Sequence, residues 1–312
     1  MSDDKPLWLK KKIVLDRSGV SEVKNLIDDL HLNTVCQSAM CPNIFECFAN
    51  RTATFMLMGD ICTRNCSFCS VKTGRPYMID EDEPYRIARA VKKMGLKYAV
   101  MTSVTRDDLP DGGSHHFVKT IREVKKLNPG VRIECLIPDF KGDTDSLETV
   151  LNEGLDVLNH NMETVERVFR KVKKTSDYKT SLGVLKNVKL FRSDIFTKSG
   201  FMLGLGETEE EIESLLMDLK KADCDIITIG QYLRPSEKNT PVKRYYNEEE
   251  FRKIGKIASG FGFKAVLSGI FVRSSYKADS LLEKTLNGNK RELTGHGNKS
   301  ESVIVGNSRE LL

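Results

Sequence analysis

The chain has 312 residues, of which 39% are hydrophobic and 30% are charged, and its formal net charge is +5. This length and composition supply enough apolar material for a buried core, so folding does not require disulfide bonds. The small, evenly mixed positive charge argues against general nucleic-acid binding, and no apolar run is long enough to span a bilayer. We therefore expect no nucleic-acid partner and no membrane.

The first 20 residues have neither the apolar core of a signal peptide nor the composition of a transit peptide. This predicts a cytoplasmic protein, where thiols stay reduced and grouped cysteines indicate metal binding or catalysis before a disulfide. Six of the eight cysteines form two groups of three. The remaining two, Cys135 and Cys224, stand alone in strand-like runs, which predicts that they are buried.

From about residue 53 onward, strand-like and helix-like stretches alternate along the chain. Short apolar runs predict buried strands, and apolar residues at helical spacing predict the helices between them. The strand-like runs are 52–59, 98–104, 131–139, 155–161, 195–206, 224–235 and 264–269. The alternation predicts an α/β fold with a mostly parallel sheet, and the number of units favours a partial (β/α)6 barrel of the TIM type over a short doubly wound sheet.

Polar loops follow the predicted strands, and in such barrels the chemistry collects at the carboxyl ends of the strands, which form the mouth of the barrel. The loops read CTRNCSFC, TRDDLPDGG, NHNMET, GLGETEEE and RPSEKNT. Any one of them alone is more simply an ordinary solvated turn. The inference of a site at the mouth therefore depends on the whole set.

Three regions follow from this pattern. Residues 1–50 precede the alternation and contain one cysteine group, residues 51–270 form the predicted barrel, and residues 271–312 form a C-terminal extension. The two terminal regions are expected to extend over the mouth. The polar stretch 277–312 is expected to be loosely ordered.

The second cysteine group, Cys62, Cys66 and Cys69, has the spacing C-x3-C-x2-C directly after the first predicted strand. A structural zinc site is closed by four ligands, and no second cysteine pair or nearby histidine pair completes this one. Three thiolates instead suit a 4Fe-4S cluster and leave one iron open to a small molecule. This loop resembles the signature of the radical S-adenosylmethionine (SAM) enzymes, which implies that SAM binds the open iron and that Phe68 lies near its adenine.

The first cysteine group, Cys36, Cys41 and Cys47, has the spacing C-x4-C-x5-C, which differs from that of plant-type ferredoxins. One alternative is a zinc loop that uses a fourth ligand such as His31. Two incomplete sets of three cysteines favour two clusters, one that makes a radical and one with a different purpose.

The order and spacing of the motifs over about residues 5 to 285 resemble those of the lipoyl synthase family. The motifs are the first cysteine group, RTATFMLMGDICTRNCSFCSV, TSVTRDDLPDGG, LNHNMETV, KSGFMLGLGET and the C-terminal RSSY. The resemblance implies insertion of sulfur at carbons 6 and 8 of a protein-bound octanoyl-lysine. It also implies two 4Fe-4S clusters, two SAM per lipoyl group, and consumption of the auxiliary cluster as sulfur donor.

The same resemblance implies the partners. These are octanoylated lipoyl carrier domains, of the glycine cleavage H protein or the 2-oxoacid dehydrogenase E2 type, and an electron donor such as flavodoxin or ferredoxin. An unactivated C–H bond offers no acidic proton, so we expect no side chain to act as a catalytic acid, base or nucleophile.

The fourth ligand of the auxiliary cluster is, by this resemblance, a serine of RSSY, and the family pattern favours Ser275. A serine oxygen is a harder and weaker iron ligand than a thiolate, so its bond is replaceable during turnover. Adjacent side chains of an extended segment point in opposite directions, so only one serine faces the cluster. The residues alone do not separate Ser275 from Ser274, and a turn role stays open for both.

Candidate SAM-binding residues lie at the ends of two predicted strands. They are Thr102 and Ser103 after the second strand, and Asn161 and Glu163 after the fourth. Hydroxyl and carboxylate groups there can hold ammonium or ribose groups. Two other functions stay open: a different radical enzyme that inserts sulfur or a methylthio group, and a non-catalytic zinc or iron–sulfur protein.

Overall fold

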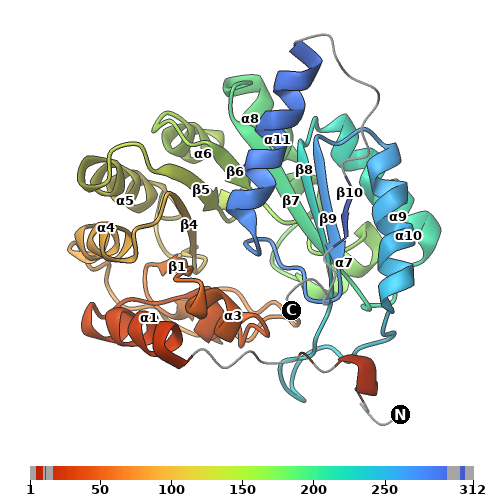
Figure 1. The fold of residues 1–312 in the computed structure, drawn as a ribbon, viewed down its shortest axis with the longest axis horizontal. Coiled ribbons are helices and arrows are strands. Elements are labelled where there is room, and N and C mark those ends of the chain that lie inside the picture. Colours follow the sequence, from red (N-terminus) through yellow and green to blue (C-terminus); the bar gives the residue numbers. More distant parts are fainter. Residues whose placement is uncertain (1–4, 10, 12–16, 294–302, 306–312) are drawn as a thin grey trace.

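The structure is a computed structural model that describes residues 5–9, 11, 17–293 and 303–305. Its main feature is a curved parallel sheet whose strand order is β1-β4-β5-β6-β7-β8-β9-β10 (Figure 1). The strands are β1 (Thr54–Leu57), β4 (Tyr98–Ser103), β5 (Arg132–Leu136), β6 (Val157–Asn159), β7 (Phe196–Leu203), β8 (Ile226–Gln231), β9 (Ala265–Gly269) and β10 (Val303–Val305). The first seven follow chain order, so the predicted partial parallel barrel is confirmed. β10, at the edge beside β9, was not predicted.

Helices connect successive strands and cover the outer face of the sheet (Figure 1). They are α4 (Glu83–Met94), α5 (Ser114–Leu127), α6 (Thr144–Leu151), α7 (Glu166–Val172), α8 (Tyr178–Phe191), α9 (Glu209–Lys221) and α10 (Glu248–Gly260), and a short 3-10 turn, η2 (Phe140–Gly142), precedes α6. Two helices, α7 and α8, connect β6 and β7. Asp177 caps α8 by accepting a hydrogen bond from the amide of Thr180 at 3.0 Å, which starts a new helix there.

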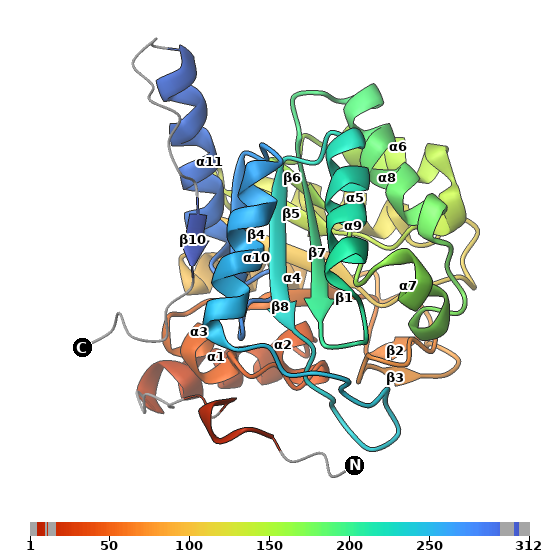
Figure 2. The ribbon, with the colours of Figure 1, turned by 90° about the vertical axis from the view of Figure 1, so that its right-hand side faces the viewer.

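The N-terminal elements and the small ladder that begins the C-x3-C-x2-C loop lie at the carboxyl ends of the strands (Figure 2). They are η1 (Leu7–Leu9), α1 (Arg17–Asp29), α2 (Val35–Ser38), α3 (Ile44–Ala49) and the two-stranded ladder β2 (Ile61–Cys62) with β3 (Lys72–Thr73). Phe55 and Met56 of β1 join these elements to the barrel: Thr34 bridges to Phe55, and the amide of Met56 donates to the carbonyl of Asn33 at 2.8 Å. In the described part of the chain, no helix is long and apolar enough to cross a membrane.

The strand register sorts side chains onto two faces. Ile227 and Ile229 of β8 pack among the outer helices, whereas Ile226 packs on the concave face with Ala265 and Leu267. Side chains alternate between the faces of a strand, so residues two apart share a face. The concave face is therefore a second packing surface, distinct from the one that the outer helices cover.

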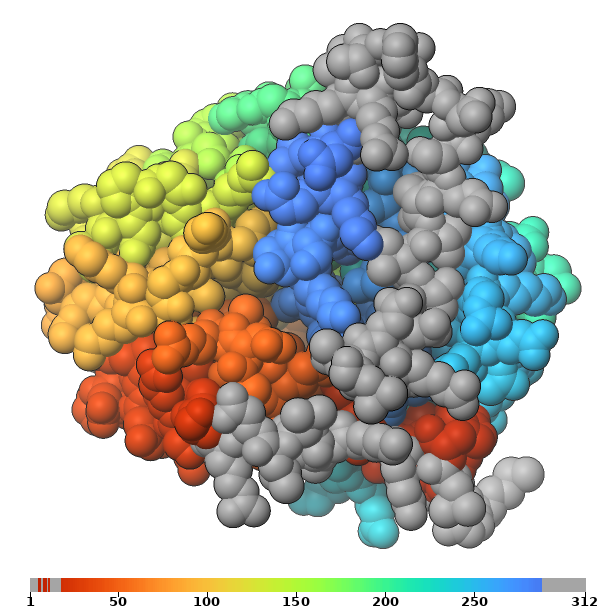
Figure 3. Space-filling view, in the orientation of Figure 1, coloured from red at the N-terminus to blue at the C-terminus, as the bar shows by residue number. Residues whose placement is uncertain are grey.

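The last helix, α11 (Ala278–Leu293), packs on this concave face (Figures 1 and 3). Leu281, which is 1% exposed, packs with the apolar residues of β8 and β9, and Arg132 pairs with Glu283 at 3.1 Å. The expectation of loose order over 277–312 is wrong for residues 278–293. A narrow apolar stripe in an otherwise polar sequence is enough to bury one helix face. Residues 294–302 and 306–312 lie outside the described residues.

Shortening a buried side chain of α11 tests this packing. We expect Leu281→Ala to lower the free energy of unfolding by about 2–5 kcal/mol, because it removes buried methyl groups and leaves a cavity. Denaturant unfolding measures the change, with the exposed Lys284→Ala as the matched control. Equal stability of the two variants would contradict the placement of α11.

Candidate active site

The C-x3-C-x2-C loop starts at the end of β2 and places three free, half-buried cysteines at the mouth. Two sulfur atoms already accept backbone hydrogen bonds: the amide of Thr105 lies 3.3 Å from Cys62 Sγ, and the amide of Val71 lies 3.4 Å from Cys69 Sγ. Hydrogen bonds to sulfur stabilise thiolate ligands and tune the reduction potential of a cluster. The loop thus directs backbone amides at two of its three sulfur atoms.

Burial raises the pKa of the Cys66 thiol to about 12 and that of the Cys69 thiol to about 11. The neighbouring cysteines raise both values further, and the Lys173 ammonium opposes the shift at Cys66. Metal-binding thiols must lose their protons, so the site needs a cation to hold all three as thiolates. Three such sulfur donors fit the irons of a cluster.

A buried arginine inside the cysteine loop fixes its position. The Arg64 guanidinium donates to both carboxylate oxygens of Asp107, at 2.7 and 2.9 Å, and to both oxygens of Asp139, at 2.8 and 2.7 Å. The side chains of Arg64 and Asp139 are 3% and 2% exposed. Although burial alone would raise it, the charge and hydrogen bonds of Arg64 hold the pKa of the Asp139 carboxyl well below its usual range. This network ties the loop to the ends of β4 and β5.

Two further segments hold the same loop through backbone contacts. The Ser67 amide donates to the carbonyl of Val172, at the end of α7, at 2.8 Å. From the loop after β8, Asn239 donates to the Cys69 carbonyl at 2.8 Å, and the Thr240 amide donates to the Ser67 carbonyl at 2.8 Å. Segments that follow β4, β5, β6 and β8 therefore hold the cysteine loop in position.

The buried arginine network gives a direct test of this positioning. We expect Asp139→Asn to lower the free energy of unfolding by about 3–5 kcal/mol, because it leaves a buried charge partly unpaired. We also expect less iron to bind at the C-x3-C-x2-C loop of a chain in which Cys36, Cys41 and Cys47 are alanine. Iron analysis after anaerobic reconstitution measures this loss.

The exposed Asp145→Asn serves as the control for this variant, because no hydrogen bond or ion pair is found for its side chain among the described residues. Full iron content in Asp139→Asn would contradict the positioning role of Arg64.

The other cysteine group lies on and between α2 and α3. Burial raises the pKa of Cys36 to about 11 and that of Cys47 to about 12, and Cys41 adds to both shifts, so the three thiols interact electrostatically. A zinc site requires donors that converge on one ion. No three His, Cys, Asp or Glu side chains in the described ranges do so, and His31 is exposed. Within the described residues, His31 therefore does not join the three cysteines in a single metal site.

The RSSY segment, residues 273–276, lies against this group although it is more than 200 residues away in sequence. Tyr276 donates to the carboxylate of Glu46 at 2.7 Å, and Asn43 donates to the carbonyl of Phe271 at 2.7 Å. Lys11 pairs with the same Glu46 at 2.5 Å. A Cβ at Gly230 would lie 2.1 Å from the carbonyl oxygen of residue 272, so only glycine lets this segment approach β8.

The two serines of RSSY differ in their contacts. The Ser274 hydroxyl donates to the side-chain oxygen of Asn161 at 2.5 Å and lies where a Cβ of Gly200 would be, so it faces the sheet. No hydrogen bond from the Ser275 hydroxyl is found among the described residues, and its side chain is half-buried. The Ser274 hydroxyl is therefore already hydrogen-bonded to Asn161, whereas the Ser275 hydroxyl has no such bond among the described residues.

The predicted SAM-binding residues lie at the mouth of the barrel, but they differ in whether their side chains already have hydrogen-bond partners. The Thr102 hydroxyl donates to the Leu136 carbonyl at 2.9 Å within the sheet, whereas Ser103 Oγ is buried without a partner among the described residues. Asn161 also accepts from the Gly200 amide at 3.0 Å. Glu163 has a left-handed backbone (φ +66°), and burial raises the pKa of its carboxyl against the opposing Lys173 and Asn161.

Phe68 is half-buried and packs against the apolar cluster to which α7, α9 and α10 contribute residues. Cys135 and Cys224 are buried, as the sequence predicts. In the GLGE turn, residues 204–207, the Glu207 carboxylate accepts hydrogen bonds from the amides of Gly204 and Leu205. These bonds within the turn give Glu207 a structural role.

Two residues at this site were missed from the sequence. Arg64 lies between Cys62 and Cys66 and is buried. A charged residue inside this cysteine loop could have been recognised from the sequence as a candidate site residue. Lys173 lies in the basic run KVKK (residues 171–174), a composition typical of a solvated surface, yet Lys173 is only 9% exposed. No feature of that run distinguishes it from its exposed neighbours.

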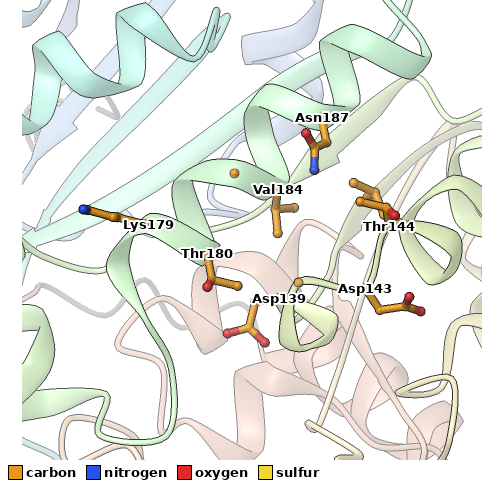
Figure 4. Close-up of a pocket in the computed structure, with 10 residues that line it drawn as sticks. Asp139, Asp143, Thr144, Lys179, Thr180, Val184 and Asn187 are labelled. Carbon is orange, nitrogen blue, oxygen red and sulfur yellow. The ribbon is translucent and has the colours of Figure 1, made fainter.

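A separate cavity of about 340 Å³ lies between η2, α6 and α8, outside the sheet (Figure 4). Asp139, Asp143, Lys179 and Thr180 are among its lining residues. Of these, Asp139 is the one that also bonds to Arg64 of the cysteine loop. The cavity is thus adjacent to the arginine network and lies apart from the cysteines.

Comparison with known proteins gives consistent results. The model of the radical SAM superfamily matches residues 56–219. A lipoyl synthase of Caldanaerobacter subterraneus subsp. tengcongensis is 53% identical over 279 residues, which cover 89% of this chain and 97% of that protein. A lipoyl synthase of Aquifex aeolicus is 51% identical over 272 residues, 87% of this chain and 99% of that protein.

Solved structures share the fold at low sequence identity. Methylornithine synthase (PylB) aligns over 86% of this chain and 80% of its own with a TM-score of 0.53 and 16% identity. HydG, a maturase of the [FeFe]-hydrogenase, aligns over 88% of this chain and 72% of its own with a TM-score of 0.56 and 13% identity. These two matches support the architecture and nothing further.

Proposed function

The chain belongs to the lipoyl synthase family of the radical SAM superfamily, and we propose a division of labour between its two cysteine groups. It is a radical SAM enzyme that inserts sulfur, and it acts on lipoyl carrier proteins. In the proposal, the barrel of residues 51–270 makes the radical, and regions 1–50 and 271–312 together hold the sulfur donor.

Cys62, Cys66 and Cys69 would hold the first 4Fe-4S cluster. When bound, that cluster and SAM supply the means to remove a hydrogen atom from an unactivated carbon. The residues of the chain bind and orient these groups: backbone amides donate to sulfur, and Arg64 holds the loop. Ser103, Asn161, Glu163 and Phe68 would line the SAM site, with Thr102 supporting the sheet beneath it.

Cys36, Cys41, Cys47 and Ser275 would hold the auxiliary cluster, the proposed sulfur donor for carbons 6 and 8 of the octanoyl group. The observation that carries this proposal is the contact between RSSY and the first cysteine group, with Tyr276 bonded to Glu46, next to Cys47. The available hydroxyl of Ser275 supports it over Ser274. Two SAM would be used per lipoyl group.

The finer partners follow from the same chemistry. We propose octanoylated carrier domains of the H protein or E2 type as substrates, and flavodoxin or ferredoxin as electron donor. Eight free thiols fit a reducing compartment, for which we propose the cytoplasm.

The reaction itself is the first test. We expect the reconstituted chain, given reductant, SAM and an octanoylated carrier, to release 5′-deoxyadenosine and add two sulfur atoms to the carrier, measured by mass spectrometry. Cys62→Ala should abolish both products. Cys36→Ala should still form 5′-deoxyadenosine without adding sulfur, because it affects only the donor. Formation of 5′-deoxyadenosine without any sulfur on the carrier by the unmodified chain would overturn the proposal.

The choice between the two serines is tested by a matched pair of variants. We expect Ser275→Ala to lower sulfur transfer at least about tenfold while 5′-deoxyadenosine still forms, because it removes a ligand of the donor cluster. Ser274→Ala should keep sulfur transfer and instead weaken SAM binding, since it frees Asn161. The opposite pattern would assign the ligand to Ser274.

A further inference from the structure

Exposed cations gather around the C-x3-C-x2-C loop. Three segments provide them, residues 72–75, 171–174 and 236–240, which together contain six cations and one acid. Figure 2 shows the β2–β3 ladder, α7 and the loop after β8, which carry these segments, near one another. Five of the cations are exposed and form what we call the cation rim: Lys72, Arg75, Lys171, Lys174 and Lys238. A group of exposed charges of one sign attracts a partner of the opposite sign.

Each of the three segments touches the cysteine loop directly. The Gly74 amide donates to the Cys62 carbonyl at 3.1 Å, and the Asn239 side chain donates to the Cys69 carbonyl at 2.8 Å. The end of α7 accepts a hydrogen bond from the Ser67 amide at 2.8 Å. Every rim cation lies one or two residues from such a contact. A molecule bound to the cation rim therefore lies next to the cysteine loop.

Most of the rim cations have no acidic partner. Lys72 pairs with Asp60 at 2.7 Å, and its side chain is 74% exposed. No hydrogen bond or ion pair of the other four side chains is found among the described residues. On the outer helices, by contrast, Lys253 pairs with Glu209 at 2.9 Å. Unpaired cations keep their attraction for an acidic partner, which makes the rim complementary to an acidic surface.

Two large apolar side chains are exposed beside the cation rim. Tyr77 is 77% exposed and Met78 is 94% exposed. Asp60, and then Tyr77, raise the pKa of Lys72, so the Tyr77 side chain lies near a rim cation. Exposed apolar side chains next to polar and charged ones are typical of a surface that contacts another protein. The rim therefore fits an acidic protein better than a small anion.

The distribution of charge differs between the two cysteine groups. Residues 1–50, which contain the first group, have six cations and seven acids, so no excess of positive charge accompanies that group. A carrier domain must bring its acyl-lysine to both groups, whereas an electron donor needs to approach only the radical-forming cluster. The position of the cation rim therefore favours an electron donor over the carrier.

We propose that the cation rim docks an acidic one-electron carrier protein beside the C-x3-C-x2-C loop, with Tyr77 and Met78 as its apolar contacts. The inference rests on the proposed function, in which this loop holds the radical-forming cluster. In the electron transfer, the donor loses one electron and the cluster gains it, and no bond of this chain forms or breaks. Contacts between electron-transfer proteins are small and are steered by charge, so a few exposed cations are sufficient.

The test compares a protein donor with a small reductant. The full chain with both clusters reconstituted is assayed for 5′-deoxyadenosine with reduced flavodoxin or with dithionite, which needs no docking surface. The rim variants are Arg75→Glu/Lys238→Glu and Lys171→Glu/Lys174→Glu. Surface plasmon resonance measures the Kd for oxidised flavodoxin, and iron content is recorded for every variant.

The matched control is Lys186→Glu/Lys256→Glu on α8 and α10, which changes the net charge equally. Both lysines are exposed, and neither has a hydrogen bond or ion pair within the described ranges. We expect each rim variant to raise the Kd and the KM for flavodoxin at least about tenfold, and added salt to weaken flavodoxin binding by the unmodified chain. The rate with dithionite, the iron content and the KM for the octanoylated carrier should stay unchanged.

Unchanged flavodoxin binding in both rim variants, or an equal loss in the control, would overturn the proposal. An equal loss of rate with flavodoxin and with dithionite would also overturn it, because the rim would then serve the cluster. A raised KM for the octanoylated carrier with both reductants would assign the rim to the carrier instead. Failure of the unmodified chain to form 5′-deoxyadenosine with dithionite would overturn the proposed function itself.

Discussion

The parallel register of the sheet is the constraint on which the site depends. Because every strand runs in the same direction, the loops that follow β1, β4, β5, β6 and β8 all emerge at one edge. Because these loops converge, the single guanidinium of Arg64 can bond to carboxylates from two of them. The cysteine loop contains little regular secondary structure. Its contacts with the segments that follow the strands hold it in position.

Charge balance links the two cysteine groups. Each group has a half-buried or buried cation beside one thiol, Lys173 near Cys66 and Arg273 near Cys41. Burial lowers the pKa of Arg273, and the negative charge of Cys41 opposes that shift. Clusters bound by thiolates carry negative charge, and nearby cations help to set their potential. A buried or half-buried cation thus lies beside one thiol of each cysteine group.

The sequence predicted the repeated strand and helix units, and it identified the two groups of cysteines, because both have local signatures. Apolar runs such as that of β8 are buried whatever surrounds them, and the cysteine spacings need no tertiary information. The burial of Lys173, the split between α7 and α8, and the helix at 278–293 depend on tertiary partners. Leu281 lies in a polar stretch, and its apolar neighbours come from strands far away in the chain.

The sequence alone could not distinguish Ser274 from Ser275, because their directions also depend on tertiary contacts. Alternation along an extended segment shows that the two side chains diverge, but not which one faces the first cysteine group. Asn161 and Gly200, on two other strands, settle the direction of Ser274. Such information exists only once the sheet has formed.

The position of α11 has a consequence for biosynthesis. This helix and the RSSY segment follow all seven barrel strands in the chain, so the ribosome makes them after the barrel. Until they emerge, Ile226, Ala265 and Leu267 face water on the concave side, a state that favours chaperone capture or aggregation. The loop with Cys62 has all three of its thiols before the RSSY segment is made, whereas the first cysteine group gains its contacts with that segment only afterwards.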